Sequence, residues 1–449
     1  MASTYLTRTF TATGNRKIFT TSFWVKRSGL SSGQSPIFSS DYNNSNDTYS
    51  MMYFTNDYLA FYSKDNTTTL QFLTNARFRD VNGWYNIVIA FDTTQTTASN
   101  RVKFYVNGEQ ITSFDTATYP PLDADNTWFN RNWEHVIGRR SYDGATYFDG
   151  SLSHFNFIDG TAYDASAFGS TDSTTGEWKI NTSPSVTYGT NGFFILKDGN
   201  SVTDQSGNSN NWSVGGGTLT KTEDSPSNVF ATGNPLFVKL GTWSNGNNSI
   251  VGSTSTNVRP QMWSTLGAKT GKFYAEAKYT DKTGGMVGVS DYTATNTIIN
   301  AGTYQGNAVG SWGFWNDGSK YDNGQGSSSY GSAWNTNDII QIALDLDNEF
   351  VYFGINGTWQ NSGNPASGAS GTYGLALTNT RDEHWFMSWG DGSQGNSATC
   401  HVNYGNGYFA TTAVSSNSGN GYSATGSLGI FQYQPPTGYT ALSTKGLNL

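Results

Sequence analysis

The chain has 449 residues, which is enough for two or three domains of ordinary size. Its 52 glycines, its 15% aromatic content and its many Ser, Thr and Asn residues predict short strands joined by turns, since the long runs of helix-forming residues typical of helical proteins are missing. A net charge of -8, with no basic run longer than Arg139-Arg140, argues against nucleic-acid binding. The single Cys400 excludes an intrachain disulfide network and a multi-cysteine zinc site.

The N-terminus, MASTYLTRTF, lacks a basic region followed by an apolar core, so we predict no signal peptide. No apolar stretch approaches the length that crosses a membrane, which predicts a protein without membrane insertion. We therefore expect synthesis in a cytoplasm, which agrees equally with later release in a particle.

Residues 1–170 contain short segments of alternating hydrophobicity that predict antiparallel strands. IFTTSFWV begins at Ile18, and WYNIVIAFD is followed after a loop by RVKFYVNG, which ends in an Asn-Gly turn signal. FDGSLSHFNF follows from Phe148, and TAYDASAFG, which ends at Gly169, predicts a short helical turn. These motifs, with SFWVKRS and IGRR in the same order, resemble the laminin-G-like, concanavalin A-type sandwich. The resemblance implies two curved antiparallel sheets with a rim of loops that binds glycans or proteins.

Residues 171–235 are rich in Ser, Thr, Asn and Gly, and we expect a linker with short strands that pack on one neighbour. GFFILKD, from Gly192 to Asp198, predicts a strand. DQSGNSNNWSV resembles a segment common near the start of laminin-G-like repeats.

Residues 236–449 contain motifs that resemble a SPRY domain, with an extended C-terminal tail. GKFYAEAKYTD begins at Gly271, SWGFWNDGSKYDNG at Ser311, and DIIQIALDLDNEFVYFGINGTW at Asp338. YGLALTN and FMSWGDG follow in the order of that family's later strands. The predicted fold class is therefore all-β: a laminin-G-like jelly roll and a SPRY sandwich, both antiparallel, joined by a partly structured Gly/Ser/Asn-rich segment.

The joint pattern of both halves, the bridge between them and the ending PPTGYTAL resembles virion surface proteins of marine tailed bacteriophages. The resemblance implies a virion structural protein, a tail fibre or surface knob, that is made in the host cytoplasm and recognises a host-surface glycan or protein. A capsid decoration or cement protein without a receptor role is one alternative, and a polysaccharide depolymerase is another. The expected partners are other virion proteins and further copies of the chain, most simply as a homotrimer.

Two motifs are similar to catalytic patterns, and neither supports an enzyme. GLSSG places Ser31 in a G-x-S-x-G pattern, but Pro36 and a strand follow where a nucleophile elbow needs a helix, so we expect a turn. DLDNE, from Asp345 to Glu349, is similar to the paired carboxylates of sandwich-fold glycosidases, but it begins with Asp where their pattern has Glu. Its place at a hairpin turn favours a solvated turn.

We expect no cofactor, with one alternative left open. The loop from Asp123 to Glu134 has acidic residues at calcium-loop spacing, but Trp128 stands where an EF-hand requires glycine. A simple calcium site that uses Asp123 or Asp125 at a sandwich rim stays open, because laminin-G-like domains sometimes hold calcium there. The four histidines show no metal-like spacing.

Aromatic residues among Gly, Ser and Asn predict the binding sites, because aromatic faces stack on sugars while Asn and Asp bond hydroxyl groups. The alternative for these residues is packing in the core. The favoured set is expected on SPRY loops: Trp312, Trp315, Asp317, Tyr321, Tyr330 and Trp334. Trp128 and Asp125 are the second choice, on the first sandwich.

Overall fold

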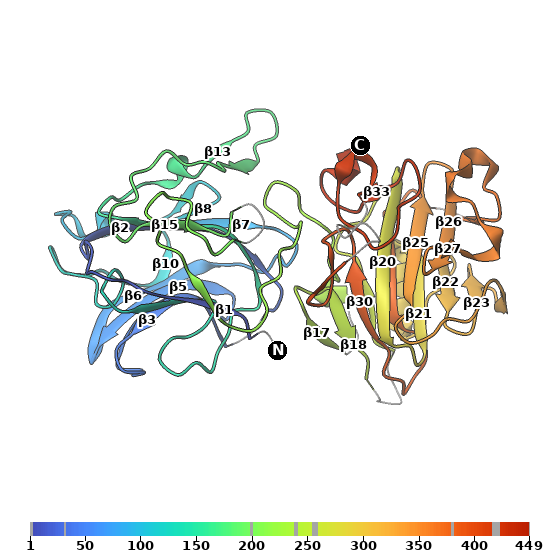
Figure 1. The fold of residues 1–449 in the computed structure, drawn as a ribbon, viewed down its shortest axis with the longest axis horizontal. Coiled ribbons are helices and arrows are strands. Elements are labelled where there is room, and N and C mark those ends of the chain that lie inside the picture. Colours follow the sequence, from blue (N-terminus) through green and yellow to red (C-terminus); the bar gives the residue numbers. More distant parts are fainter. Residues whose placement is uncertain are drawn as a thin grey trace. The chain divides into compact units, whose positions relative to one another are not determined.

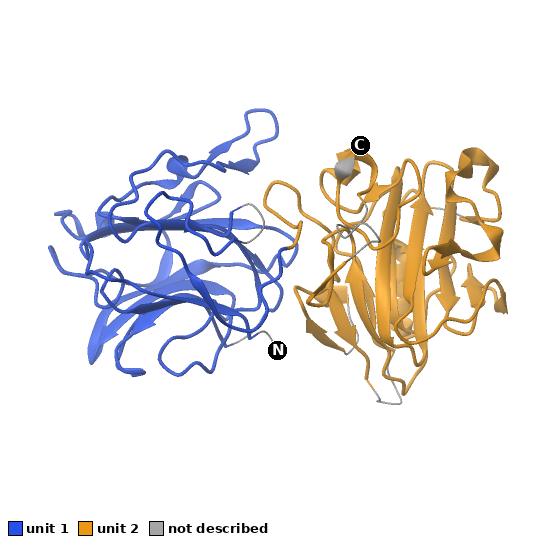
Figure 2. Ribbon diagram, viewed as in Figure 1, with its two compact units in different colours: residues 1–221 blue, residues 222–449 orange. Residues whose placement is uncertain are grey.

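Antiparallel strands form almost all of the regular structure, as the sequence predicts. The computed structural model describes residues 3–30, 33–197, 201–237, 241–253, 259–378, 381–414 and 423–448. The chain divides into two compact units, Met1–Lys221 and Thr222–Leu449 (Figure 2).

Unit 1 consists of two sheets that face each other across a phenylalanine-rich core (Figure 1). The larger sheet has the order β10 (Phe114–Thr118), β6 (Thr67–Arg77), β5 (Tyr58–Asp65), β4 (Thr48–Thr55), β3 (Gln34–Asp41), β11 (Glu134–Ile137), β1 (Tyr5–Thr9) and β16 (Ser213–Gly216). The smaller sheet has the order β15 (Phe193–Ile195), β12 (Gly150–Asp159), β2 (Ile18–Arg27), β7 (Tyr85–Asp92), β8 (Val102–Val106) and β9 (Glu109–Ile111). Strands β13 (Gly169–Thr171) and β14 (Trp178–Ile180) form a separate pair. Phe38 and Phe61 from the larger sheet and Phe23 and Phe157 from the smaller one are fully buried between them.

Residues 171–235, expected as a linker, are split at the boundary between the units. Up to Lys221 they belong to unit 1, where β15 pairs with β12 at an edge of the smaller sheet and β16 pairs with β1 at an edge of the larger sheet. Trp212, from the DQSGNSNNW motif, is buried and packs edge-on against Phe193, with ring centroids 4.9 Å apart. Residues 222–235 belong to unit 2.

Unit 2 is also a two-sheet sandwich. Its larger sheet has the order β17 (Thr242–Ser244), β18 (Ser249–Val251), β30 (Thr399–Asn403), β20 (Lys272–Asp281), β25 (Ile339–Asp345), β26 (Phe350–Ile355) and β27 (Thr358–Trp359), with β28 (Leu375–Ala376) on β26 and β33 (Thr440–Ala441) on β20. Its smaller sheet has the order β19 (Gln261–Trp263), β29 (Trp385–Asp391), β21 (Gly285–Asp291), β22 (Ser311–Trp315), β23 (Ser319–Asp322) and β24 (Ser327–Ser329). Strands β31 (Tyr408–Phe409) and β32 (Thr412–Ala413) form a separate pair.

Helices are short throughout the described ranges. The α-helix α1 (Tyr292–Ala301) begins where the Asp291 carboxylate accepts a hydrogen bond from the Ala294 backbone and ends at Gly302 in a left-handed conformation. The 3-10 helices are η1 (Ala98–Asn100), η2 (Ala165–Ala167), η3 (Pro235–Phe237), η4 (Gln360–Ser362), η5 (Pro365–Ser370), η6 (Thr425–Ser427) and η7 (Gly446–Asn448). The helical turn predicted around Thr161–Gly169 is present as η2. None of the helices in the described ranges is long and apolar enough to cross a membrane.

Both Asn-Gly signals make tight turns, which connect β8 to β9 and β26 to β27. Asn107 and Gly108 have φ values of 47° and 86°, and Asn356 and Gly357 have 49° and 84°. Positive φ at both central residues is the geometry that matches the twist of a hairpin and that favours Asn-Gly.

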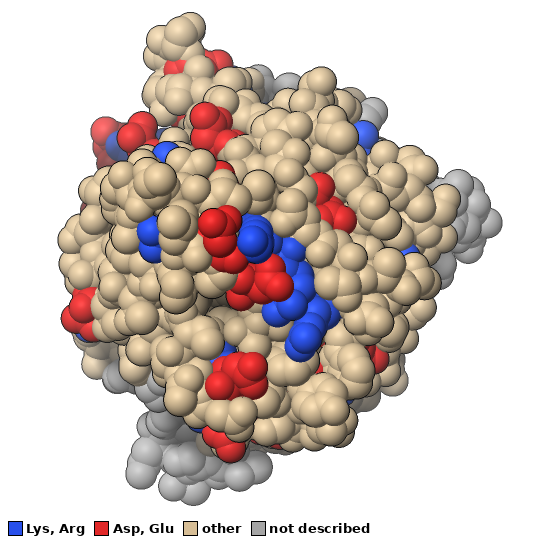
Figure 3. Space-filling model, turned by 90° about the vertical axis from the view of Figure 1, so that its left-hand side faces the viewer, with Lys and Arg blue, Asp and Glu red and all other residues tan. Residues whose placement is uncertain are grey.

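Charged groups are sparse on the surface, as a charged content of 13% requires. On the face shown in Figure 3, a short row of basic side chains adjoins acidic ones, and uncharged residues cover most of the area.

Candidate functional site

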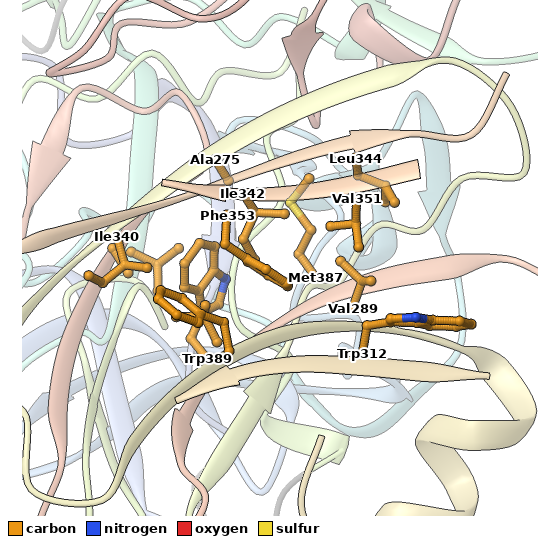
Figure 4. Close-up of a cluster of buried hydrophobic side chains, with 14 of the residues drawn as sticks. Ala275, Val289, Trp312, Ile340, Ile342, Leu344, Val351, Phe353, Met387 and Trp389 are labelled. Atoms are coloured by element: carbon orange, nitrogen blue, oxygen red, sulfur yellow. The ribbon is translucent and has the colours of Figure 1, made fainter. Parts of the chain in front are cut away.

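Side chains alternate between the two faces of β22, so two of the predicted binding residues, Trp312 and Trp315, point in opposite directions. Trp312 and Phe314 point into the core of unit 2, where Trp312 is 2% exposed and lies with Val289 and Met387 in one buried cluster (Figure 4). Trp315 is one position out of phase, so its side chain lies on the outer side of the sheet and is partly exposed. The expectation that Trp312 binds ligand from a loop is therefore corrected: it is a core residue.

Tyr330 and Trp334 also belong to the core rather than to a binding loop. Trp334 is 0% exposed, its indole N–H donates to the Trp315 carbonyl oxygen at 2.9 Å, and its ring lies 4.6 Å from that of Tyr279. Tyr330 is buried, and its hydroxyl accepts a hydrogen bond from the Phe353 backbone at 3.3 Å. The loop that follows β24 thus turns inward, which makes both rings inaccessible to a ligand.

Trp315 and Tyr321, two of the predicted binding residues, lie with ring centroids 5.1 Å apart, and a third ring joins them. Tyr304 lies 5.4 Å from Trp315 and 5.2 Å from Tyr321 in edge-to-face contact. All three side chains are partly exposed. We call Tyr304, Trp315 and Tyr321 the aromatic triad. The sequence did not predict Tyr304 as a binding residue, because Tyr304 lies outside the strand motifs, in the segment between α1 and β22.

The aromatic triad is held in place from two sides. The Arg259 guanidinium lies 5.5 Å from the Tyr304 ring centroid and donates to the carbonyl oxygens of Gly392, at 2.9 Å, and Gly302, at 2.7 Å. Gly306 has a φ of 86°, and a Cβ atom there would stand 2.2 Å from the Tyr321 carbonyl oxygen. Only glycine allows this close approach of the Tyr304 segment to β23.

Unpartnered polar groups lie beside the aromatic triad on the outer side of the smaller sheet. Gln305 is 1% exposed, yet neither atom of its carboxamide has a hydrogen-bond partner among the described residues. Gly288 pairs with Gly313 and Ser388 on the neighbouring strands, and a Cβ at Gly288 would stand 2.9 Å from that of Gln305. The Ser388 hydroxyl and the Trp315 indole N–H are likewise buried and unpartnered. Buried polar groups are normally hydrogen-bonded, so these atoms are exceptions among the described residues.

Asp317 lies at the tip of the turn between β22 and β23 and is exposed. Its carboxylate accepts a hydrogen bond from the Ser319 backbone at 2.8 Å, which is a common way for aspartate to stabilise a turn. The structure therefore gives Asp317 a role in shaping the turn that joins Trp315 to Tyr321.

The second-choice residues have separate environments in unit 1. Trp128 is mostly buried, and its indole N–H donates to the Lys64 carbonyl oxygen at 3.1 Å. Asp125 is exposed and forms an ion pair with Arg16, at 3.0 Å between Nη1 and Oδ2.

The alternative of a calcium site does not fit the residues present. The Asp125 carboxylate already receives Arg16, and the Asp123 carboxylate lies 3.6 Å from the Lys17 ammonium group. Within the described part of the chain, no group of three or more His, Cys, Asp or Glu side chains is arranged to hold a metal ion.

Of the two motifs similar to catalytic patterns, the first has its serine, Ser31, outside the described residues. The acidic residues of the other make structural contacts. Asp345 is buried, not solvated, and pairs with Lys272 at 2.9 Å. Asp347 accepts a hydrogen bond from the Gly271 backbone at 2.7 Å. The two carboxylates thus hold the turn between β25 and β26 against the start of β20.

Comparison with known proteins identifies both domain types. Family models match the concanavalin A-like lectin/glucanases superfamily, in its laminin-G form, over residues 2–165 and the SPRY domain over residues 272–377. A search of curated proteins found no match.

Solved structures similar to the chain include SPRY domains, stonustoxin and a pentraxin. The SPRY domain of human HERC1 is 15% identical, with a TM-score of 0.29, and the match covers 38% of this chain and 96% of that one. Stonustoxin is 16% identical, with a TM-score of 0.29, over 38% of this chain and 27% of its own. A native heptameric SAP-like pentraxin from Limulus polyphemus is 16% identical, with a TM-score of 0.27, over 36% of this chain and 71% of its own. The family models show that the chain contains a laminin-G-like domain of the concanavalin A-like superfamily followed by a SPRY domain.

Proposed function

We propose that this chain is a non-enzymatic binding protein that recognises a glycan through the aromatic triad of its SPRY unit. The observation that carries the proposal is the mutual contact of three partly exposed rings on the outer side of the smaller sheet. Aromatic faces take the C–H surface of a sugar.

The wider setting of this activity is the surface of a tailed-phage virion. The support is the combination of sequence motifs across the whole chain, together with two sandwich units whose loops can vary while the sheets stay fixed. We propose a tail fibre or surface knob that assembles with other virion proteins and with itself, as a homotrimer, and that uses the aromatic triad for host attachment.

A glycan array probed with the full-length protein tests the binding activity. We expect a restricted set of glycans to bind, and we expect Trp315→Ala and Tyr321→Ala to lower that binding about tenfold or more, a typical loss for stacking rings at the centre of a site. Tyr373→Ala is the matched control, because Tyr373 is an exposed aromatic residue of the same unit outside the triad. Unchanged binding in both triad variants would contradict the proposal.

Two further measurements separate the alternative functions. A depolymerase would shorten the bound polysaccharide and release new reducing ends, whereas a binding protein leaves it intact. A protein that binds no glycan and no cell of a panel of marine bacteria, but that co-sediments with phage capsids, would favour the decoration role.

A further inference from the structure

A second aromatic group lies at one rim of unit 1 and combines exposed rings with a guanidinium. Tyr42 and Trp133 are 42% and 36% exposed, and their ring centroids are 5.1 Å apart. Tyr42 also stacks on Trp128 at 5.4 Å, with 14° between the ring planes. The Arg131 guanidinium carbon lies 4.6 Å from the Trp128 ring centroid. We call Tyr42, Trp128, Arg131 and Trp133 the rim cluster.

The backbone beneath the rim cluster is fixed by His135, which is fully buried. Burial lowers the pKa of His135 to about 4, so the ring is neutral and has one donor and one acceptor nitrogen. Its Nε2 accepts from the Asn130 backbone at 3.1 Å, so its Nδ1–H donates to the Trp133 carbonyl oxygen at 3.0 Å. The same oxygen accepts a hydrogen bond from the Phe10 backbone at 3.3 Å. Hydrogen bonds therefore hold the loop that carries Arg131 and Trp133 at both Asn130 and Trp133, while the Trp133 ring stays exposed.

Arg131 differs from the other basic residues near this rim because it has no acidic partner among the described residues. Lys64 pairs with Asp47 at 2.5 Å, and Arg16 pairs with Asp125. Arg131 makes no hydrogen bond or ion pair with the described residues, and its contact is the Trp128 ring. Its guanidinium is thus available to an anion, and stacking on the ring fixes its plane. Glu134 is exposed and adjoins Trp133 in sequence, so it is the nearest acidic residue along the chain to this ring.

We propose that the rim cluster binds an acidic sugar residue without the help of a metal ion. The exposed faces of Tyr42 and Trp133 take the sugar ring, and Arg131 pairs with its carboxylate or sulfate group. The site goes beyond the function proposed for unit 2, because it lies on the other unit and selects for charge.

The test measures binding of the full chain to oligogalacturonate, oligoguluronate and a sulfated carrageenan oligosaccharide. At least one of them should bind, with the same affinity when a calcium chelator is present. The fully methyl-esterified or desulfated form of the bound glycan keeps the sugar and removes the charge. It should bind about tenfold more weakly, the loss expected for one charge-assisted pair. Raised ionic strength should weaken binding of the acidic form alone.

Matched variants assign the binding to this site. Trp133→Ala and Arg131→Gln should each lower the affinity about tenfold, and Glu134→Gln should raise it about twofold by removing a repulsive charge. Arg77→Gln is the control for Arg131, because Arg77 also lies over a ring, that of Tyr58, at 4.4 Å. Leu122→Ala, at another exposed apolar residue of unit 1, is the control for Trp133.

The proposal is overturned if no acidic glycan of the set binds, if the neutral form binds equally well, or if Trp133→Ala and Arg131→Gln bind like their controls. None of these outcomes contradicts the proposal that the aromatic triad binds a glycan. That proposal is tested separately by Trp315→Ala and Tyr321→Ala, which alter unit 2 alone.

Discussion

The Asn130 side-chain amide donates a hydrogen bond of 2.6 Å to the carboxylate of Asp159, in a network that joins distant parts of unit 1. The Asn130 side-chain Oδ1 accepts a hydrogen bond from the Asn191 side-chain amide at 2.8 Å, and the backbone N–H groups of Asn15 and Asn191 donate to Asp159 at 2.7 and 3.1 Å. The loop before β11, the end of β12 and the segment before β15 therefore share one buried carboxylate. This network ties the segment before β15 to the first sandwich, to which residues 189–197 and 201–212 belong.

Replacing Asp159 with Ala should loosen that segment. Several buried donors would lose their acceptor, and we expect the free energy of unfolding of unit 1 to fall by about 3 kcal/mol. Hydrogen exchange of peptides that cover residues 189–197 and 201–212 should show faster opening. Asp115→Ala, at an exposed carboxylate of the same unit, is the control. Unchanged exchange in the Asp159 variant would contradict this role for the network.

The two tryptophans that the sequence places in one loop region should differ in their effect on stability. Trp334→Ala removes a fully buried indole and should lower the free energy of unfolding of unit 2 by about 3 to 5 kcal/mol. Trp315→Ala removes a partly exposed ring and should cost about 1 kcal/mol. Urea unfolding of both variants measures this difference, and equal losses would show that Trp315 is also a core residue.

The sequence predicted the two sandwiches because strand alternation and turn chemistry are local signals. It also predicted that Trp315 and Tyr321 are binding candidates, but it grouped them with Trp312, which faces the opposite side of the same strand. Side chains alternate between the two faces of a strand, so the sequence SWGFW could have shown that Trp312 and Trp315 point to opposite faces. The alternative of core packing describes Trp312 correctly.

Other features of the sites depend on contacts between residues far apart in sequence. The Tyr42 ring stacks on that of Trp128, which lies on a different loop. Arg16 forms an ion pair with Asp125, the residue that the calcium alternative assigned to a metal ion. Tyr304 joins the aromatic triad only because Gly306 allows its segment to approach β23. No local pattern encodes such pairings, so they emerge only from the folded chain.

The stability of unit 2 should depend on the protonation of Glu276. This carboxyl is fully buried, and burial raises its pKa to about 7, while the Tyr274 hydroxyl and the backbones of Gln432 and Tyr433 donate to it. Between pH 4.5 and 7 the folded chain keeps a proton that the unfolded chain releases. The stabilisation present below pH 4.5 is therefore lost as the pH rises toward 7.

Glu276→Gln removes this ionisation and should flatten the dependence of unit 2 stability on pH. Cys400, the single cysteine, is buried in unit 2, so its reaction with a dithiodipyridine reagent reports the unfolding of this unit. Burial also raises the pKa of Asp391 to about 7, so a smaller slope of the same sign should remain. A slope identical to that of the unchanged protein would contradict the role of Glu276.

His135 should give unit 1 the opposite dependence on pH. Its folded pKa of about 4 lies below the value of 6.5 that the unfolded chain has, so the unfolded chain binds a proton first as the pH falls. Stability present above pH 6.5 is lost on the way to pH 4. A hydrogen-exchange pulse at one fixed pH, applied after equilibration in urea at pH 7 and pH 5, measures this loss in peptides of residues 33–197. His135→Phe should lower stability at both pH values and reduce the difference between them, and an undiminished difference would contradict the assignment.

The central claim is that the aromatic triad binds a glycan. Titration calorimetry of the full-length protein with the glycan selected on the array tests it most directly, using the double variant Trp315→Ala, Tyr321→Ala and the control Tyr373→Ala. We predict a loss of affinity of about a hundredfold in the double variant, equivalent to about 2.7 kcal/mol, and no loss in the control. An affinity of the double variant equal to that of the unchanged protein, with both proteins folded, would contradict the account.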